Sequence, residues 1–152
     1  MTTHIKLPQT GSCRCGKVVI EVAKAPVMTS ACHCRGCQKM SASAFSLTAM
    51  VPAEGFRVVS GEVVKGGLQG PELDHYVCSR CKTWMFTRIT GFEALVNVRP
   101  TLFEVVEWTV PFIETMTCAR LPWVCFPAQH SFERMPDPEE FPALLAGFAA
   151  RA

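Results

Sequence analysis

The chain is poor in charge and has no long hydrophobic run. Only 18% of its residues are charged, the formal net charge is +2, and lysine and arginine form no run. Nucleic-acid-binding proteins usually carry a basic patch or stripe, so we expect no nucleic-acid partner. No apolar segment approaches the ~20 residues that a membrane helix needs, so we expect no membrane partner either.

The amino terminus also lacks the features of a secretion signal. Residues 1–8 contain no apolar core followed by the small residues of a cleavage site. We therefore expect a cytoplasmic protein, in which thiols stay reduced. Hydrophobic residues make up 49% of the 152 residues, which is enough for a folded core. A chain of this length predicts a single domain over residues 1–152.

Most of the sequence predicts short β-strands. Apolar side chains alternate in residues 17–22 and 44–50, as they do in half-buried strands. Residues 56–60 and 62–65 are expected to pair as a hairpin through a turn at Gly61. Further strands are expected at residues 73–77, 84–90, 94–98 and 112–118. The predicted fold class is therefore mainly β, with antiparallel sheets.

One α-helix is predicted, at about residues 138–150. Asp137 suits the N-cap, Pro138 suits the first helical position, and Glu139 and Glu140 complement the positive end of the helix dipole. Apolar side chains then recur at i, i+3, i+4 and i+7, which gives the helix one apolar stripe that we expect to cover a sheet. The stripe consists of Phe141, Leu144, Leu145 and Phe148.

Nine cysteines are present, and seven of them fall in three close clusters. The clusters are Cys13-Arg14-Cys15, Cys32-His33-Cys34-Arg35-Gly36-Cys37 and Cys78-Ser79-Arg80-Cys81. In a reducing compartment such clustering is typical of metal binding rather than of disulfides. Because zinc prefers tetrahedral sites and soft thiolate donors, the clusters predict zinc as the cofactor.

The number of thiols suggests two zinc sites. The first and third clusters together would supply four sulfurs, which is a closed and structural site. The three sulfurs of the second cluster would leave one position for water or a substrate thiol. The spacing does not show which cluster pairs with which. The clusters could instead merge into one structural site with spare buried cysteines.

Several segments around the cysteines follow the pattern of a known family. They are residues 11–18, 32–39, 76–81, 111–114 and 121–123. Together they resemble the glutathione-dependent formaldehyde-activating enzyme family, whose domain is shared with centromere protein V-type proteins. The resemblance spans about residues 11–135.

The resemblance implies an Mss4-like fold of β-sheets built around zinc. It also implies a structural zinc and a reactive zinc with an open position. The implied ligands are Cys13, Cys15, Cys78 and Cys81 for the structural zinc, and Cys32, Cys34 and Cys37 for the reactive one. Lys82 and Ser41 stand where the family usually has glycine. Lys82 must therefore accept a left-handed backbone conformation or alter its turn, at a modest cost.

Other residues near the clusters have less specific predictions. His33 lies between two ligands, so we expect its ring to point away from their metal and to pack or form hydrogen bonds, or else to touch the substrate. Lys39 is the candidate for binding a substrate carboxylate, with Arg35 beside it. Cys118 and Cys125 are expected to be small buried residues. The core or the walls of a cleft are expected to contain Trp84, Trp108 and Trp123.

The activity implied by the resemblance is that of a carbon–sulfur lyase similar to S-(hydroxymethyl)glutathione synthase. An open zinc could bind the sulfur of glutathione or another small thiol, keep it deprotonated and promote its attack on an aldehyde such as formaldehyde. The residues themselves support only the open zinc. The alternative is a non-catalytic zinc-binding module that recognises a protein or a thiol.

Overall fold

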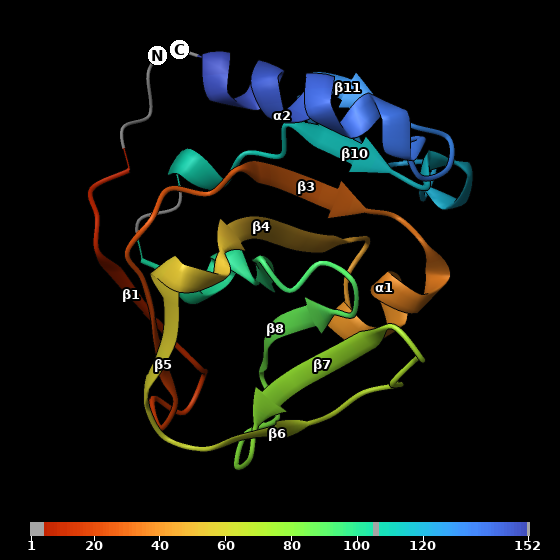
Figure 1. Cartoon of the computed structure of the whole chain (residues 1–152). Coiled ribbons are helices and arrows are strands. Elements are labelled where there is room, and N and C mark those ends of the chain that lie inside the picture. The colour runs from red at the N-terminus through yellow and green to blue at the C-terminus, as the bar shows by residue number, and fades with distance from the viewer. Residues whose placement is uncertain (1–4, 105–106, 152) are drawn as a thin grey trace.

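The computed structural model describes residues 5–104 and 107–151, which form two β-sheets. The smaller sheet has three antiparallel strands in the order β1-β2-β5 (Figure 1). Its strands are β1 (Gln9–Ser12), β2 (Val19–Val22) and β5 (Phe56–Ser60).

The larger sheet has eight strands in the order β11-β10-β3-β4-β9-β8-β7-β6. These strands are β3 (Met28–Cys32), β4 (Ser46–Pro52), β6 (Val63–Lys65), β7 (Leu73–Cys78), β8 (Trp84–Ile89), β9 (Leu95–Val98), β10 (Ile113–Thr115) and β11 (His130–Ser131). Neighbours pair antiparallel except at β10, which runs parallel to both β3 and β11. The prediction of a mainly β fold is confirmed.

The main hydrophobic core contains side chains from both sheets. Ile20 and Val22 of β2 are fully buried together with Val51 of β4 and Val96 and Val98 of β9. Burying an aliphatic side chain of this size stabilises the fold by roughly 1.5–3 kcal/mol. The two sheets are therefore held together by their shared apolar faces.

The C-terminal helix is confirmed, with a 3₁₀ turn (η5, Pro138–Glu140) leading into α2 (Phe141–Ala150). Asp137 is the N-cap as expected, and it forms a capping box with Glu140, in which Asp137 N donates to Glu140 Oε2 at 2.8 Å. Leu144 and Phe148 are buried in a second apolar cluster, and α2 lies along β10 and β11 (Figure 1). The other members of that cluster are Met28, Phe112 and Ile113.

A short helix that the sequence did not predict follows β3. This helix, α1 (Arg35–Ser41), has Cys34 as its N-cap and ends at Ala42, whose φ is 49°. Seven residues are too few to show a helical hydrophobic pattern in the sequence. The remaining short turns are the 3₁₀ segments η1 (Ala53–Gly55), η2 (Pro100–Leu102), η3 (Glu107–Thr109) and η4 (Thr117–Ala119).

The predicted hairpin between residues 56–60 and 62–65 is wrong. The first segment pairs with β2 in the smaller sheet, whereas the second pairs with β7 in the larger one. Gly61 has a φ of 81°, and a Cβ atom there would lie 2.2 Å from the carbonyl oxygen of Lys17. The chain therefore crosses between sheets at a point where the backbones approach too closely for a side chain.

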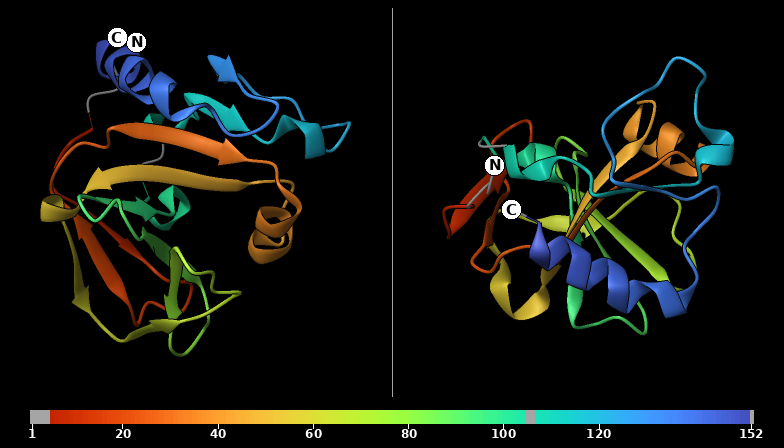
Figure 2. Two further views of the ribbon diagram at one scale, coloured as in Figure 1. Left: turned by 45° about the vertical axis from the view of Figure 1, so that its right-hand side comes forward. Right: turned by 90° about the horizontal axis from the view of Figure 1, so that it is seen from above.

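The strand predicted at residues 112–118 is shorter than expected. It ends at Thr115, because Met116 takes a left-handed conformation with a φ of 57°. The segment between β10 and β11 then arches beside α1 (Figure 2). Cys118 accordingly lies in a 3₁₀ turn and not in a strand.

Candidate metal centres

Four sulfurs from two distant parts of the chain meet between the sheets; we name them the four-sulfur cluster. Cys13 and Cys15 lie in the turn between β1 and β2, while Cys78 ends β7 and Cys81 lies in the turn that follows. All four Sγ atoms lie within 4.8 Å of one another, with 3.5 Å between Cys13 and Cys15 and 3.9 Å between Cys15 and Cys78. Tetrahedral zinc with Zn–S bonds of about 2.3 Å places its sulfurs about 3.8 Å apart, so the spacing fits zinc.

Two similar turns present these sulfurs. Val18 N donates to Cys13 Sγ at 3.2 Å, and Cys81 N donates to Cys78 Sγ at 3.5 Å. Backbone N–H groups that point at sulfur stabilise its thiolate form. Lys82 has a φ of 60°, which confirms that it accepts the left-handed conformation usually left to glycine.

Thr83 joins the two turns and was missed by sequence reasoning. Its Oγ1 accepts a hydrogen bond from Arg14 N at 3.1 Å and lies 3.1 Å from Cys81 Sγ. The hydrogen bond from the Thr83 hydroxyl lowers the pKa of Cys81 to about 5. A hydroxyl residue two positions after the last cysteine of a cluster is the signal that could have identified it.

The other three clustered cysteines meet where β3 passes into α1; we name them the three-sulfur cluster. Cys32 ends β3, Cys34 caps α1 in an extended conformation, and the first turn of the helix brings Cys37 back. Their half-buried Sγ atoms lie within 4.8 Å of one another, and Cys37 N donates to Cys34 Sγ at 3.3 Å. Within the described residues no further histidine, cysteine or carboxylate joins this group.

The three-sulfur cluster favours the loss of a proton even before a metal binds. A hydrogen bond from Cys37 lowers the pKa of Cys32 to about 5 and raises the pKa of Cys37. Burial opposes the thiolate at Cys32, but hydrogen bonds from the backbone at Cys34 and from Thr115 support it. Thiolates are the form in which cysteine binds metals, so this donor set also fits zinc.

His33, which stands between Cys32 and Cys34 in the sequence, is fully buried. Its Nε2 lies 2.8 Å from Glu114 Oε2, and its ring stacks on Phe126 with a centroid distance of 5.5 Å. As expected, the ring packs and forms a hydrogen bond. Its Nδ1 has no hydrogen-bond partner among the described residues.

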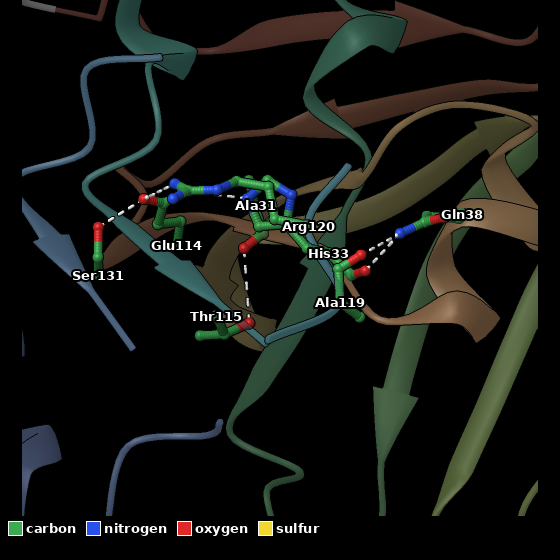
Figure 3. Close-up of polar contacts among 8 residues, drawn as sticks. All are labelled: Ala31, His33, Gln38, Glu114, Thr115, Ala119, Arg120 and Ser131. Atoms are coloured by element: carbon green, nitrogen blue, oxygen red, sulfur yellow. Dashed lines mark hydrogen bonds and ion pairs between the residues drawn. The ribbon is translucent and has the colours of Figure 1, made fainter. Parts of the chain in front are cut away.

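Glu114 is the centre of a polar network that includes His33, Arg120 and Ser131 (Figure 3). Besides His33, its carboxylate accepts hydrogen bonds from Ser131 Oγ and, at 3.0 Å, from Arg120 Nη1. Burial raises the pKa of Glu114, but the hydrogen bonds from Ser131 and His33 and the charge of Arg120 outweigh it and lower the pKa. The carboxylate therefore stays ionised although it is buried.

Residues 117–127 are tied to the surroundings of the three-sulfur cluster at several points. Gln38 Nε2 donates to the carbonyl oxygens of His33 at 2.7 Å and Ala119 at 2.9 Å (Figure 3). Arg120 forms an ion pair with Glu114, and the Phe126 ring stacks on the ring of His33. The segment thus lies against α1 and the end of β3.

Several predictions about this segment are wrong. Cys118 and Cys125 are exposed and not buried, because residues 117–127 cross the surface instead of forming a core strand. Trp123 lies in the same segment and is 75% exposed.

Of the other tryptophans, Trp108 is in the core as expected and Trp84 is half-buried. The candidate substrate-binding residue Lys39 is exposed in the last turn of α1.

A buried arginine that the sequence did not single out lies behind the three-sulfur cluster. Arg99 is only 8% exposed, and its guanidinium donates to the carbonyl oxygens of Leu47 at 3.0 Å and Asn97 at 3.3 Å. It also donates to Thr87 Oγ1 at 3.4 Å, and its Cζ lies 3.9 Å from the centre of a Trp84 ring. Burial lowers the pKa of Arg99 to about 10.

Comparison with known proteins identifies a family for this chain and structures that are similar to it. The profile of the family described as "Glutathione-dependent formaldehyde-activating enzyme" matches residues 8–118, which is more than half of the chain. A crystal structure of a Rhodobacter sphaeroides protein is similar with a TM-score of 0.53 at 22% identity, covering 64% of this chain and 90% of that one. That likeness concerns the fold alone. None of the helices in residues 5–104 and 107–151 has the length and apolar character to span a bilayer.

Proposed function

Since the chain belongs to the glutathione-dependent formaldehyde-activating enzyme family, we propose that it is a zinc-dependent carbon–sulfur lyase. Its substrates would be glutathione or another small thiol and an aldehyde such as formaldehyde. The observation that carries this proposal is the three-sulfur cluster, which has three converging cysteine ligands and no fourth among the described residues. A site of this kind leaves room for a substrate sulfur, whereas the four-sulfur cluster does not.

The two clusters would have different roles. We propose that Cys13, Cys15, Cys78 and Cys81 hold a structural zinc, and that Cys32, Cys34 and Cys37 hold the reactive one. When bound at the three-sulfur cluster, zinc would supply a positive centre that binds the substrate sulfur and lowers the pKa of its thiol. The low pKa of Cys32, and the backbone N–H of Cys37 that donates to Cys34 Sγ, prepare the cluster as thiolates for that role.

The proposed reaction needs no oxidant or reductant. The substrate thiol gives up its proton, its sulfur forms a bond to the aldehyde carbon, and the carbon–oxygen double bond becomes a single bond. The oxygen then takes up a proton, which gives a hydroxymethyl thioether. The reverse reaction breaks the carbon–sulfur bond and releases the aldehyde.

Residues outside the cluster would position the substrate. Lys39 is exposed two residues after Cys37 on α1, and we propose that its ammonium group binds a carboxylate of glutathione. Gln38 and Glu114 hold residues 117–127 beside the cluster, so this segment would form one wall of the site.

We further propose that the chain is one domain of the Mss4-like kind and that it works in the cytoplasm. All nine cysteines are free thiols, and seven of them lie in metal-type clusters. Such clusters are compatible with a compartment that keeps thiols reduced.

Exchange NMR spectroscopy of glutathione and formaldehyde with the zinc-loaded protein tests the proposed reaction. We expect the protein to accelerate the exchange between free and hydroxymethylated glutathione. The Cys34→Ser variant should lose this effect, whereas Cys118→Ser, which removes an exposed thiol outside both clusters, should keep it. If the wild-type protein binds glutathione but does not accelerate exchange, the non-catalytic thiol-binding module is the correct function.

A further inference from the structure

Arg99 is a buried cation without a protein counter-ion. Its hydrogen-bond acceptors are two backbone carbonyls and one hydroxyl, all of them neutral. Across residues 5–104 and 107–151, no carboxylate forms an ion pair with it. Its Nε, which is also buried, has no hydrogen-bond partner in that part of the chain. An unpaired buried charge is costly, so a negative charge is expected nearby.

The three-sulfur cluster supplies negative charge that acts on Arg99. The guanidinium binds the carbonyl of Leu47, and the preceding residue Ser46 is the register partner of Cys32 in the β3–β4 ladder. The Ser46 side chain also forms a hydrogen bond with Cys37. In agreement with this placement, the charges of Cys37 and Cys32 raise the pKa of Arg99 and partly offset the effect of burial.

The charge balance of the cluster shows what such a cation would do. Three thiolates and one divalent ion leave a net charge of −1, and a substrate thiolate makes it −2. A neutral ligand such as imidazole leaves the charge at −1. A fixed positive charge beside the cluster therefore stabilises the thiolate-bound state more than a state with a neutral ligand.

We propose that Arg99 is the counter-ion of the three-sulfur cluster, a positioning residue that makes this site select an anionic thiolate over a neutral ligand. The inference rests on the proposed open zinc site. Two residues of β8 hold the guanidinium in place. The Trp84 ring packs against its face, and the Thr87 hydroxyl accepts a hydrogen bond from one of its N–H groups. Thr87 is itself fixed by hydrogen bonds with His75 at 2.8 Å and Trp84 at 3.2 Å.

Ligand binding to the cobalt-loaded full chain tests this role without turnover. The probes are 2-mercaptoethanol, which binds as a thiolate, and imidazole, and both are followed by the visible absorption of cobalt. In Arg99→Met we expect the affinity for 2-mercaptoethanol to fall on the order of 10-fold or more, while that for imidazole changes less than about 2-fold. Arg99→Lys, which keeps the charge, should restore most of the thiolate affinity.

Matched controls separate charge from structure. Arg88→Met removes an exposed arginine of β8 that packs over Phe56 and Phe86, and it should leave both affinities unchanged. The absorption of cobalt in the four-sulfur cluster reports whether each variant is folded. If Arg99→Met does not fold, Arg99→Gln takes its place as the neutral variant.

Two results would overturn the inference in distinguishable ways. Equal loss of both affinities in the neutral variants would make Arg99 a merely structural residue. A wild-type protein that binds no 2-mercaptoethanol at all would overturn the proposed thiol site, and the role of Arg99 with it.

Discussion

The two cysteine clusters are built from very different lengths of chain. In the four-sulfur cluster, Cys15 and Cys78 are 63 positions apart and connect the turns of two different sheets. The three-sulfur cluster lies within six consecutive residues at the junction of β3 and α1. A link that closes a long loop restricts the unfolded chain more than one that closes a short loop. Metal at the four-sulfur cluster should therefore stabilise the fold more than metal at the three-sulfur cluster, which we propose to be the reactive site.

The largest effect is expected from Cys78→Ser. Structural zinc contributes about 10 kcal/mol or more of apparent binding free energy, which is comparable to the ~5–15 kcal/mol stability of a typical domain. The variant should unfold or aggregate, and circular dichroism with size-exclusion chromatography will show this. A folded, monodisperse variant would remove the distinction between the clusters.

Cys34→Ser should leave the protein folded but abolish metal binding at the three-sulfur cluster. The zinc content should fall by half, and exchange of glutathione with formaldehyde should slow on the order of 10²-fold or more, since the proposed chemistry depends on that metal. Elemental analysis and thermal unfolding measure the two effects. Should Cys34→Ser be as unstable as Cys78→Ser, both clusters would be structural.

Glu114→Gln tests whether the polar network around His33 stabilises the fold as well as the surroundings of the three-sulfur cluster. Loss of the charge-assisted hydrogen bonds should destabilise the protein by about 1–3 kcal/mol at neutral pH. Folding lowers the pKa of Glu114. The contribution of its charge to the free energy of unfolding is therefore complete above the pKa of the unfolded chain, about 4.3, and is lost as the pH falls through the pKa of the folded protein. The difference in stability between wild type and variant, followed by urea unfolding, should therefore shrink in acid. If the difference in stability persists at a pH below the folded pKa of Glu114, the charge of Glu114 is not what stabilises the fold.

Lys82→Gly should have the smallest effect. It relieves the left-handed backbone of Lys82, which should stabilise the fold by up to about 1 kcal/mol, although the hydrogen bond from its Nζ to Ser79 O is lost. Thermal unfolding measures the gain, and thiol binding at the three-sulfur cluster should not change. A change in thiol binding would mean that the two clusters are coupled.

Local patterns in the sequence predicted local structure. The caps and apolar stripe of residues 137–148 identified α2, and the family pattern identified the unusual backbone at Lys82. Close spacing also brought Cys32, Cys34 and Cys37 together, since a single turn of chain joins them. These features depend on residues a few positions apart.

Other features, which depend on distant contacts outside the family's cysteine pattern, were missed. Nothing near Gly61 shows that its two flanking strands enter different sheets, because their partners lie elsewhere in the sequence. Glu114 pairs with His33 across 81 positions, and Arg99 reaches Leu47 across 52. The exposure of Trp123 likewise follows from the surface path of its segment and not from its composition.

Cadmium NMR spectroscopy of the fully loaded protein tests the central claim most directly. We predict two separate resonances, both in the range of sulfur ligation, because the two clusters hold different numbers of cysteine sulfurs. Addition of glutathione should move only the resonance that Cys34→Ser abolishes, as a fourth sulfur joins the three-sulfur cluster. A single resonance, or two that glutathione leaves unchanged, would contradict the account.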